Sequence, residues 1–236
     1  MKTSLTPRPA ADKRSLGRGT RALLMCGVAY SVSFVVFGDL LAGVLYPGYD
    51  HLEQTISELS ARGAPTRPLI AAFAPVWSGL LIAFGIGVLR AANGKRPLRV
   101  AGVLLIAHGV VSLQWLWFPM TARGDSISGL TRWNDVGHVT LVVWSGLFAL
   151  AEIGCGAAAF KWRFREYSIV TVVIALVFAA LTSAQAANLV DGEPTPLMGV
   201  YERVSVGAWL LWIAVLAVIL LRGRDGPGVC APDTRF

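Results

Sequence analysis

Apolar residues occur along this chain in long runs that short polar stretches separate. The first run extends from Ala22 to Tyr46, and five more follow: about 69–90, 98–118, 134–160, 167–190 and 201–221. A membrane-spanning helix needs roughly 20 predominantly apolar residues, and each run meets that length. The pattern therefore predicts an all-α, polytopic membrane protein with six transmembrane helices.

The longest polar interruption is YPGYDHLEQTISELSARGAPTRP, residues 46–68. Asp50 stands where an N-cap is expected, and Glu53, three residues later, is its capping-box partner. A glycine and then a proline follow as a stop signal. We predict a short amphipathic helix from His51 to Arg62.

Two faces of this loop helix differ in character. One interpretation of the polar face is a solvated shoulder with charge pairs, and the other is a lid that directs His51 and Glu58 into the bundle. The apolar face consists of Leu52, Ile56 and Leu59, and the polar face of His51, Thr55, Glu58 and Arg62.

Basic residues are unevenly distributed among the segments that connect the runs. The two tails, with the second and fourth connections, hold 16 of the 21 Lys and Arg, whereas the other three connections hold five beside eight acidic residues. The positive-inside rule then predicts cytoplasmic N and C termini and an extracytoplasmic 46–68 loop. The expected organisation is a basic cytoplasmic tail (1–20), a six-helix transmembrane domain (21–222) and a cytoplasmic C-terminal tail (223–236).

Composition supports this class of protein. Charged residues make up 15% of the chain and hydrophobic residues 55%, against about 25% charged in soluble domains. The net charge of +7 follows from the topology signal, so membrane lipids are the expected partners and nucleic acid is not. Cys26, Cys155 and Cys230 all fall at the predicted cytoplasmic side, where no extracytoplasmic disulfide forms.

Polar side chains recur at similar depth near the predicted outer end of the spans. Asp39 lies about 10 Å below Tyr46 at the rise of an α-helix. An ionisable residue in a membrane normally faces the bundle interior with a partner, and we expect Arg203 or His138 for Asp39. The other members of the layer are Gln114, Asp135, His138, Gln185, Asn188, Glu202 and Arg203. Hydrogen bonding between helices is the alternative role, which we favour for the three amides.

Two further polar residues lie deeper. His108 is near the midplane of the third span, about 15 Å from its outer end, where a lone histidine is more often a satisfied core residue than a ligand. Glu152 lies in the inner half of the fourth span without an obvious charged partner, and no role is assigned to it.

Several segments together resemble one bacterial family. These are Asp39 in the first span, then YPGYD…QTISELSARGAPTR, FPMTARG followed by NDVGH, and YERVSVGAWLLW at the start of the last span. They are similar to the six-helix membrane family catalogued as domain of unknown function 998 (DUF998), over about residues 20–222. The resemblance implies six helices in the bacterial cytoplasmic (inner) membrane, with no established activity, cofactor or substrate.

The favoured functional hypothesis is a lipid or a small anionic ligand bound in a polar pocket, open to the outer leaflet, under the 46–68 loop. Arginines suit phosphate and carboxylate groups, and four of them lie on the predicted outer side: Arg62, Arg67, Arg123 and Arg203. The full candidate ligand-binding set is Glu58, Arg62, Gln114, Arg123, Asp135, Gln185, Glu202 and Arg203.

The alternative is a membrane-embedded hydrolase or lipid-modifying enzyme that uses Asp39, His51 and His138. These donors suit zinc, which would activate a bound water, or a histidine could activate Ser57 or Ser60. The HExxH, HxxxH and GxSxG motifs are all missing. A third hypothesis is a transporter with Asp39 as its proton or cation site.

Overall fold

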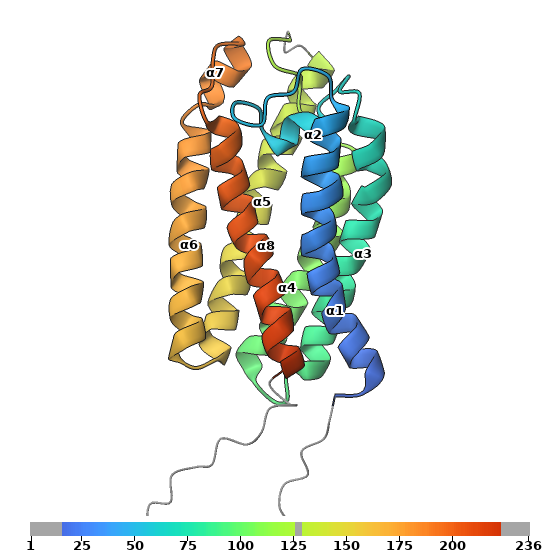
Figure 1. Ribbon diagram of the computed structural model, residues 1–236, viewed down its shortest axis with the longest axis vertical. Coiled ribbons are helices and arrows are strands. Elements are labelled where there is room, and N and C mark those ends of the chain that lie inside the picture. Colours follow the sequence, from blue (N-terminus) through green and yellow to red (C-terminus); the bar gives the residue numbers. More distant parts are fainter. Residues whose placement is uncertain (1–15, 126–128, 223–236) are drawn as a thin grey trace, which may run out of the picture.

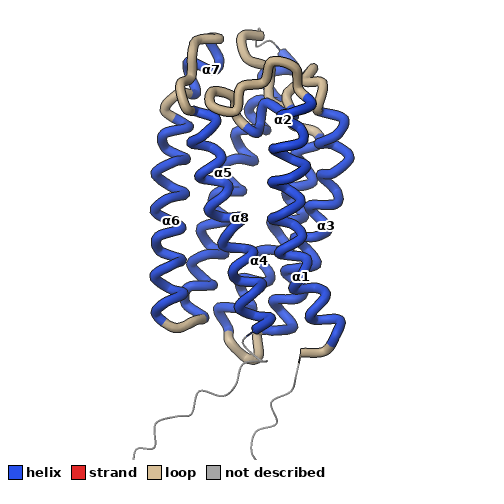
Figure 2. Tube along the Cα trace, viewed as in Figure 1, coloured by secondary structure: helices blue, strands red, loops and turns tan. Residues whose placement is uncertain are grey.

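A computed structural model describes residues 16–125 and 129–222. Every regular element in those ranges is a helix, and the long helices run side by side along the long axis of the molecule (Figures 1 and 2). Six of the described helices are long and apolar enough to cross a membrane. The predicted six-helix membrane architecture is confirmed. The tail 223–236, most of the tail 1–20 and Cys230 lie outside the described residues.

The first span is a continuous helix made of three pieces. α1 (Arg18–Ser33) passes into a π-helix, η1 (Phe34–Leu41), and ends as α2 (Ala42–Leu45). The remaining elements are η2, a 3-10 helix (Ile56–Ser60), α3 (Arg67–Ala91), α4 (Arg96–Ser112), η3, a 3-10 helix (Leu113–Leu116), α5 (Gly129–Ala159), α6 (Trp162–Ser183), α7 (Ala186–Asp191) and α8 (Met198–Arg222).

Two spans start with proline in their first turn. Pro68 occupies this place in α3 and Pro97 in α4. The N–H groups of a first helical turn have no partner within the helix, so a residue without an N–H is tolerated there. Both helices therefore begin at the residue before the proline, slightly earlier than the apolar runs predicted.

α3 and α4 pack closely because glycines lie at their contact. A Cβ atom at Gly85 would lie 2.8 Å from the carbonyl oxygen of Gly102, and one at Gly109 would lie 3.0 Å from the carbonyl oxygen of Ser78. Small residues allow helix backbones in membranes to approach in this way. The contact also places Ser78 and Gly109 at the same depth in the bundle.

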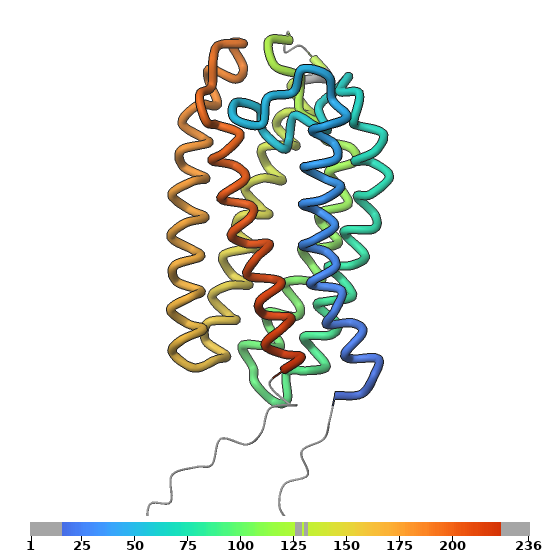
Figure 3. The backbone as a smooth tube through the Cα atoms, in the orientation of Figure 1, coloured from blue at the N-terminus to red at the C-terminus, as the bar shows by residue number. Residues whose placement is uncertain are grey.

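The two ends of the bundle differ in how the chain turns. At one end, short turns join α3 to α4 and α5 to α6, and α1 begins and α8 ends there (Figure 3). At the other end, longer segments cover the helices, namely residues 46–66, 117–125 and 192–197. We call this second end the loop end. Its predicted extracytoplasmic location stays a prediction.

A short helix lies in the 46–66 loop, as predicted, but its bounds, type and cap differ from those expected for His51 to Arg62. The helix is the 3-10 helix Ile56–Ser60, and its capping box is formed by Thr55 and Glu58. The Asp50 carboxylate caps a turn before it, by accepting a hydrogen bond from the N–H two residues on.

Tertiary hydrogen bonds explain the shorter helix. The carbonyl oxygens of residues 51–54 accept from side chains and N–H groups of other segments, so they are not available for an α-helix. The predicted apolar face is divided as a result, because Leu52 is 56% exposed whereas Leu59 is fully buried.

Candidate functional site

Asp39 and Arg203 form an ion pair between the first and the last span. The guanidinium Nε lies 3.1 and 3.2 Å from the two carboxylate oxygens, and Nη2 lies 2.9 Å from Oδ1. Asp39 is on the π-helix η1 and is buried. Of the two partners expected for Asp39, the structure supplies Arg203.

Arg203 also binds the backbone of the 46–66 loop. Its Nη1 donates to the carbonyl oxygens of His51 at 2.9 Å and Gln54 at 2.8 Å. Its Nη2 donates to the Tyr49 hydroxyl at 2.6 Å. Together with the Asp39 pair, these bonds use all five N–H donors of the guanidinium. The side chain therefore joins the first span, the 46–66 loop and α8, and it has no donor left for an anionic ligand.

Tyr49 completes this group. Its hydroxyl lies 3.0 Å from the carbonyl oxygen of Gln54 and 2.7 Å from that of Thr55. Burial raises the pKa of Tyr49 above the ordinary value for a phenol, although the neighbouring Arg203 acts in the opposite direction. Tyr49 is therefore protonated at neutral pH, and it can accept from Arg203 and donate to the loop backbone.

Glu202 and the start of α8 bind the same loop reciprocally. The Glu202 carboxylate accepts from the Ile56 N–H and, at 2.9 Å, from the Ser57 hydroxyl. In return, the Gly199 N–H donates to the Leu52 carbonyl oxygen at 3.0 Å. The first N–H groups of a helix have no partner within it, so the loop serves as the N-terminal cap of α8.

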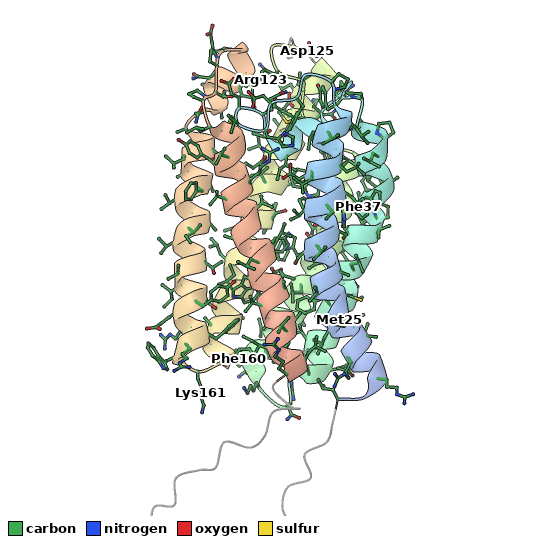
Figure 4. All side chains as sticks on the ribbon, viewed as in Figure 1. Met25, Phe37, Arg123, Asp125, Phe160 and Lys161 are labelled. Atoms are coloured by element: carbon green, nitrogen blue, oxygen red, sulfur yellow. The ribbon has the colours of Figure 1, made fainter. Side chains whose placement is uncertain are left out.

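A second ion pair, Glu58 with Arg123, joins the three loop-end segments. Arg123 Nε lies 3.0 Å from Glu58 Oε1, and Nη2 lies 3.1 Å from Oε2. Nη1 donates to the Thr195 hydroxyl at 2.8 Å, and Nη2 to the Glu53 carbonyl oxygen at 3.3 Å. Arg123 lies at the loop end, far from Lys161 at the opposite end (Figure 4). We call the two ion pairs and Glu202 together the loop clasp.

The other predicted site residues lie outside the loop clasp, and most of them bond to backbone or hydroxyl groups near the loop end. The Asp135 carboxylate accepts from the N–H and the hydroxyl of Thr121, both at 2.7 Å. His138 Nδ1 lies 3.1 Å from the carbonyl oxygen of Phe118. The side chains of Gln185 and Asn188 donate to the carbonyl oxygens of Pro196 and Pro194, Arg67 donates to those of Ser60 and Leu116, and Gln114 and Arg62 are exposed.

The set Asp39, His51 and His138 is not assembled into one site. Asp39 faces Arg203, and the ring of His51 packs against Gly43 at the end of the first span. His138 is hydrogen-bonded to the carbonyl oxygen of Phe118, and its ring packs edge-on against Trp115. Within the described ranges, no group of three or more His, Cys, Asp or Glu is placed to hold a metal ion. The geometry therefore gives no support to a zinc site formed by these three residues, because each has a separate partner.

Beneath the loop clasp lies a cavity of about 400 Å³. Ser57 and Glu202 line its end at the loop, and His108 and Trp209 line it deep in the bundle. Most of its wall is apolar, contributed by all six spans. The exposed residues of its wall all belong to α5 and α6, among them Val142 and Leu176, which are each 50% exposed. The cavity therefore opens sideways between α5 and α6.

Three polar side chains meet at the inner end of this cavity. His108 Nδ1 lies 3.0 Å from Glu152 Oε1, and Trp209 Nε1 donates to Glu152 Oε2 at 2.9 Å. Glu152 is fully buried and His108 is 4% exposed. Phe148 stacks on the His108 ring. The sequence analysis identified His108 and Glu152 separately and did not pair them. The pairing could have been predicted, because one basic and one acidic side chain lie deep in two consecutive spans that are otherwise apolar there.

Two buried polar atoms at the cavity lack a hydrogen-bond partner among the described residues, Trp77 Nε1 and Ser145 Oγ. Buried polar groups are nearly always hydrogen-bonded. Both atoms have almost no accessible surface, so neighbouring side chains enclose them although other parts of Trp77 and Ser145 line the cavity.

Six apolar spans, a hydrogen-bonded loop clasp and a cavity open to the side define a polytopic helical membrane protein. Its residues 17–219 match the family described as "Protein of unknown function (DUF998)". The chain belongs to this family. Comparisons with curated proteins and with solved structures found no match.

Proposed function

We propose that the protein binds one lipid-like molecule of the membrane in the cavity between its spans. The observation that carries the proposal is the cavity itself, whose volume of about 400 Å³ lies within the usual range for small-molecule sites. Its wall is mainly apolar, and it opens between α5 and α6 towards the side where lipid would surround the bundle. A molecule from the bilayer can therefore enter without crossing water.

The polar groups of the cavity favour a neutral ligand over an anionic one. Among the described residues that line it, none is lysine or arginine. The arginines that suggested an anionic head group are instead bonded to the protein: Arg203 to Asp39, and Arg123 to Glu58. This supports a ligand whose polar part is uncharged.

The enzyme and transporter hypotheses receive less support. The proposed catalytic residues Asp39, His51 and His138 each have separate partners. A coupled cation would have to compete with Arg203 for Asp39. Ligand binding needs neither arrangement, so it remains the function that the geometry favours.

Filling the cavity tests this function. Gly146 and Gly154 are both exposed glycines of α5 with open space where a Cβ would stand, but only Gly146 lines the cavity. We expect Gly146→Phe to remove most of the lipid that co-purifies with the protein in mild detergent, and Gly154→Phe to leave it unchanged. Native mass spectrometry and extraction of bound lipid provide the measurement. Equal lipid content in the wild type and both variants would refute the proposal.

A further inference from the structure

The cavity is long and narrow, and it runs inward from the loop end. On α5 its lining residues lie on one face from His138 to Ile153, a distance of about 22 Å at the rise of an α-helix. On α3 they extend from Ile70, close to the loop end, to Leu81, about 16 Å deeper. A compact cavity of about 400 Å³ would be much shorter. The shape therefore fits an extended chain better than a compact ring system.

The inner end of the cavity is mainly apolar, and most of its polar groups bond to one another. Trp209 Nε1 donates to Glu152, and His108 Nδ1 bonds to the same carboxyl group. His108 Nε2 and the hydroxyl group of Tyr30 are the exceptions, because neither has a partner among the described residues. These two atoms define the alternative place for the polar part of a ligand.

Two serines and a carboxyl group line the loop end of the cavity. The Ser57 hydroxyl donates to Glu202 at 2.9 Å, and the Ser60 hydroxyl donates to the carbonyl oxygen of Ser57 at 3.1 Å. A hydroxyl oxygen that donates its proton keeps its acceptor positions, and a carboxyl group has more acceptor positions than the two that Ile56 and Ser57 use. This end therefore presents several acceptors to a ligand.

Trp115 adds a donor to the same end of the cavity. Its indole N–H has no hydrogen-bond partner in the described part of the chain and, unlike that of Trp77, it is not enclosed by its neighbours. Arg67 donates to the carbonyl oxygens of both Ser60 and Leu116, the residue after Trp115, so η3 lies beside the serines. The loop end thus combines acceptors with a donor.

We propose that the cavity binds a single-chain lipid with an uncharged, hydroxyl-bearing head group, held beside Ser60, Glu202 and Trp115, with its chain extended towards the inner end. The inference rests on the proposed function and names its ligand class. A hydroxyl group both donates and accepts, so it fits this mixed set in either protonation state of Glu202. An ammonium head has no acceptor for Trp115. A carboxylate head would lie beside Glu202, and no described residue of the cavity wall is a lysine or arginine that pairs with it.

The position of the cavity in the bundle supports this orientation. Each of the six spans has one of its ends at the loop end, so the loop end lies at a membrane surface whichever way the bundle faces. A lipid that enters between α5 and α6 then keeps its head at the level of the other head groups and its chain in the hydrocarbon region.

A photoreactive lipid tests the orientation in the full-length protein in mild detergent. The probe is 1-monomyristoylglycerol with a diazirine at the far end of its chain. An extended backbone advances about 3.4 Å for every three bonds, so this molecule matches a cavity about 22 Å long. After illumination, mass spectrometry of the digested protein should find crosslinks at the inner end, to Leu81, Leu150 or Ile153. Crosslinks to Ser60 or Ile70 instead would show the opposite orientation and overturn the proposal.

Three variants locate the head group. Trp115→Phe removes the indole N–H but keeps an aromatic ring against His138, and Ser60→Ala removes a hydroxyl group that bonds only within its own turn. Each should weaken the binding of monomyristoylglycerol about fivefold, measured by native mass spectrometry, and the second variant keeps the test if the first does not fold. Tyr30→Phe is the matched control at the inner end and should leave binding unchanged. Weaker binding in Tyr30→Phe, with no change in the other two, would overturn the proposal.

Head-group probes separate this inference from the proposed function. We expect myristate, tetradecylamine and tetradecane to bind at least about fivefold more weakly than monomyristoylglycerol. Tighter binding of any of the three would show that the head group is wrong. If no single-chain probe binds but a lipid still co-purifies and is lost in Gly146→Phe, the single-chain ligand is wrong and the lipid cavity stands. If no probe binds and no lipid co-purifies, the proposed function fails as well.

Discussion

Among the described residues, ionisable side chains pair across segments that are far apart in the sequence. The pairs are Asp39–Arg203, Glu58–Arg123 and His108–Glu152. Removing one member of a buried pair is more harmful than the pair is beneficial, because the other charge is left unpaired. The consequences of substitution therefore depend on which member is removed and on what else it holds.

Arg203 holds more than its carboxylate partner, so its loss should be the more severe. Arg203→Met leaves Asp39 unpaired and removes the donor to the His51 and Gln54 carbonyl oxygens, and we expect it to lower the free energy of unfolding by about 3–5 kcal/mol. Asp39→Asn should lower it by about 1–3 kcal/mol. Unfolding of the purified protein by SDS in mixed micelles measures both.

The double variant tests whether the two residues act together. Asp39→Asn in the Arg203→Met background removes the stranded charge, so the double variant should be no less stable than Arg203→Met alone. Asp50→Asn is the control, since Asp50 is exposed and bonds only within its own turn. Additive losses in the double variant would show that the ion pair is not what stabilises this contact.

The depth of each polar residue was predicted by counting residues from the outer end of its span at the rise of an α-helix. This predicted some of the contacts and missed others for a physical reason. It placed Asp39 and Arg203 at one level, where they meet. It separated His108 from Glu152, because it assumed that the fourth span starts at the membrane surface. α5 instead begins at Gly129, and its first turns lie beside the loop-end segments, where Asp135 binds Thr121. Glu152 therefore lies nearer the middle of the bundle than its position in the apolar run suggested.

At the scale of elements, apolar runs predicted the spans well, whereas the loop helix was predicted poorly. Run length and hydrophobicity are sufficient for a membrane helix, since its backbone hydrogen bonds are all internal. The 46–66 loop is different, because α8 and two arginines compete for the carbonyl oxygens of residues 51–54. A local capping signal at Asp50 and Glu53 contains no information about those distant donors.

The docking of α8 onto the loop requires a glycine at its start. A Cβ atom at Gly199 would overlap the carbonyl oxygens of His51 and Gln54, while one at Gly207, in the same helix, would meet open space. Alanine is the better helix former by about 1 kcal/mol, so we expect Gly207→Ala to raise the thermal unfolding temperature slightly. Gly199→Ala should instead destabilise the protein by about 1–3 kcal/mol and expose the loop to added protease. A rise in unfolding temperature for both variants would contradict this close packing.

At the scale of the whole molecule, the two ends have different charge. The loop end carries the acidic residues Asp125 and Glu193 beside its arginines, and much of its basic charge is paired within the loop clasp. The opposite end carries Lys95 and Lys161 in its short turns. The positive-inside rule assigns the more basic end to the cytoplasm. The loop end, with the loop clasp above the cavity, would then face the cell exterior.

Single cysteines at the two ends test this orientation. Arg62 in the 46–66 loop and Lys161 in the turn between α5 and α6 are both exposed, and each can be replaced by cysteine after Cys26, Cys155 and Cys230 are changed to serine. In intact cells, a membrane-impermeant maleimide should label Arg62→Cys, whereas Lys161→Cys should react only after the cells are permeabilised. The fold constrains the outcome, because an odd number of spans separates the two positions: α3, α4 and α5. Labelling of both cysteines in intact cells would therefore contradict the six-span bundle, and the reverse pattern would keep the bundle while inverting its orientation in the membrane.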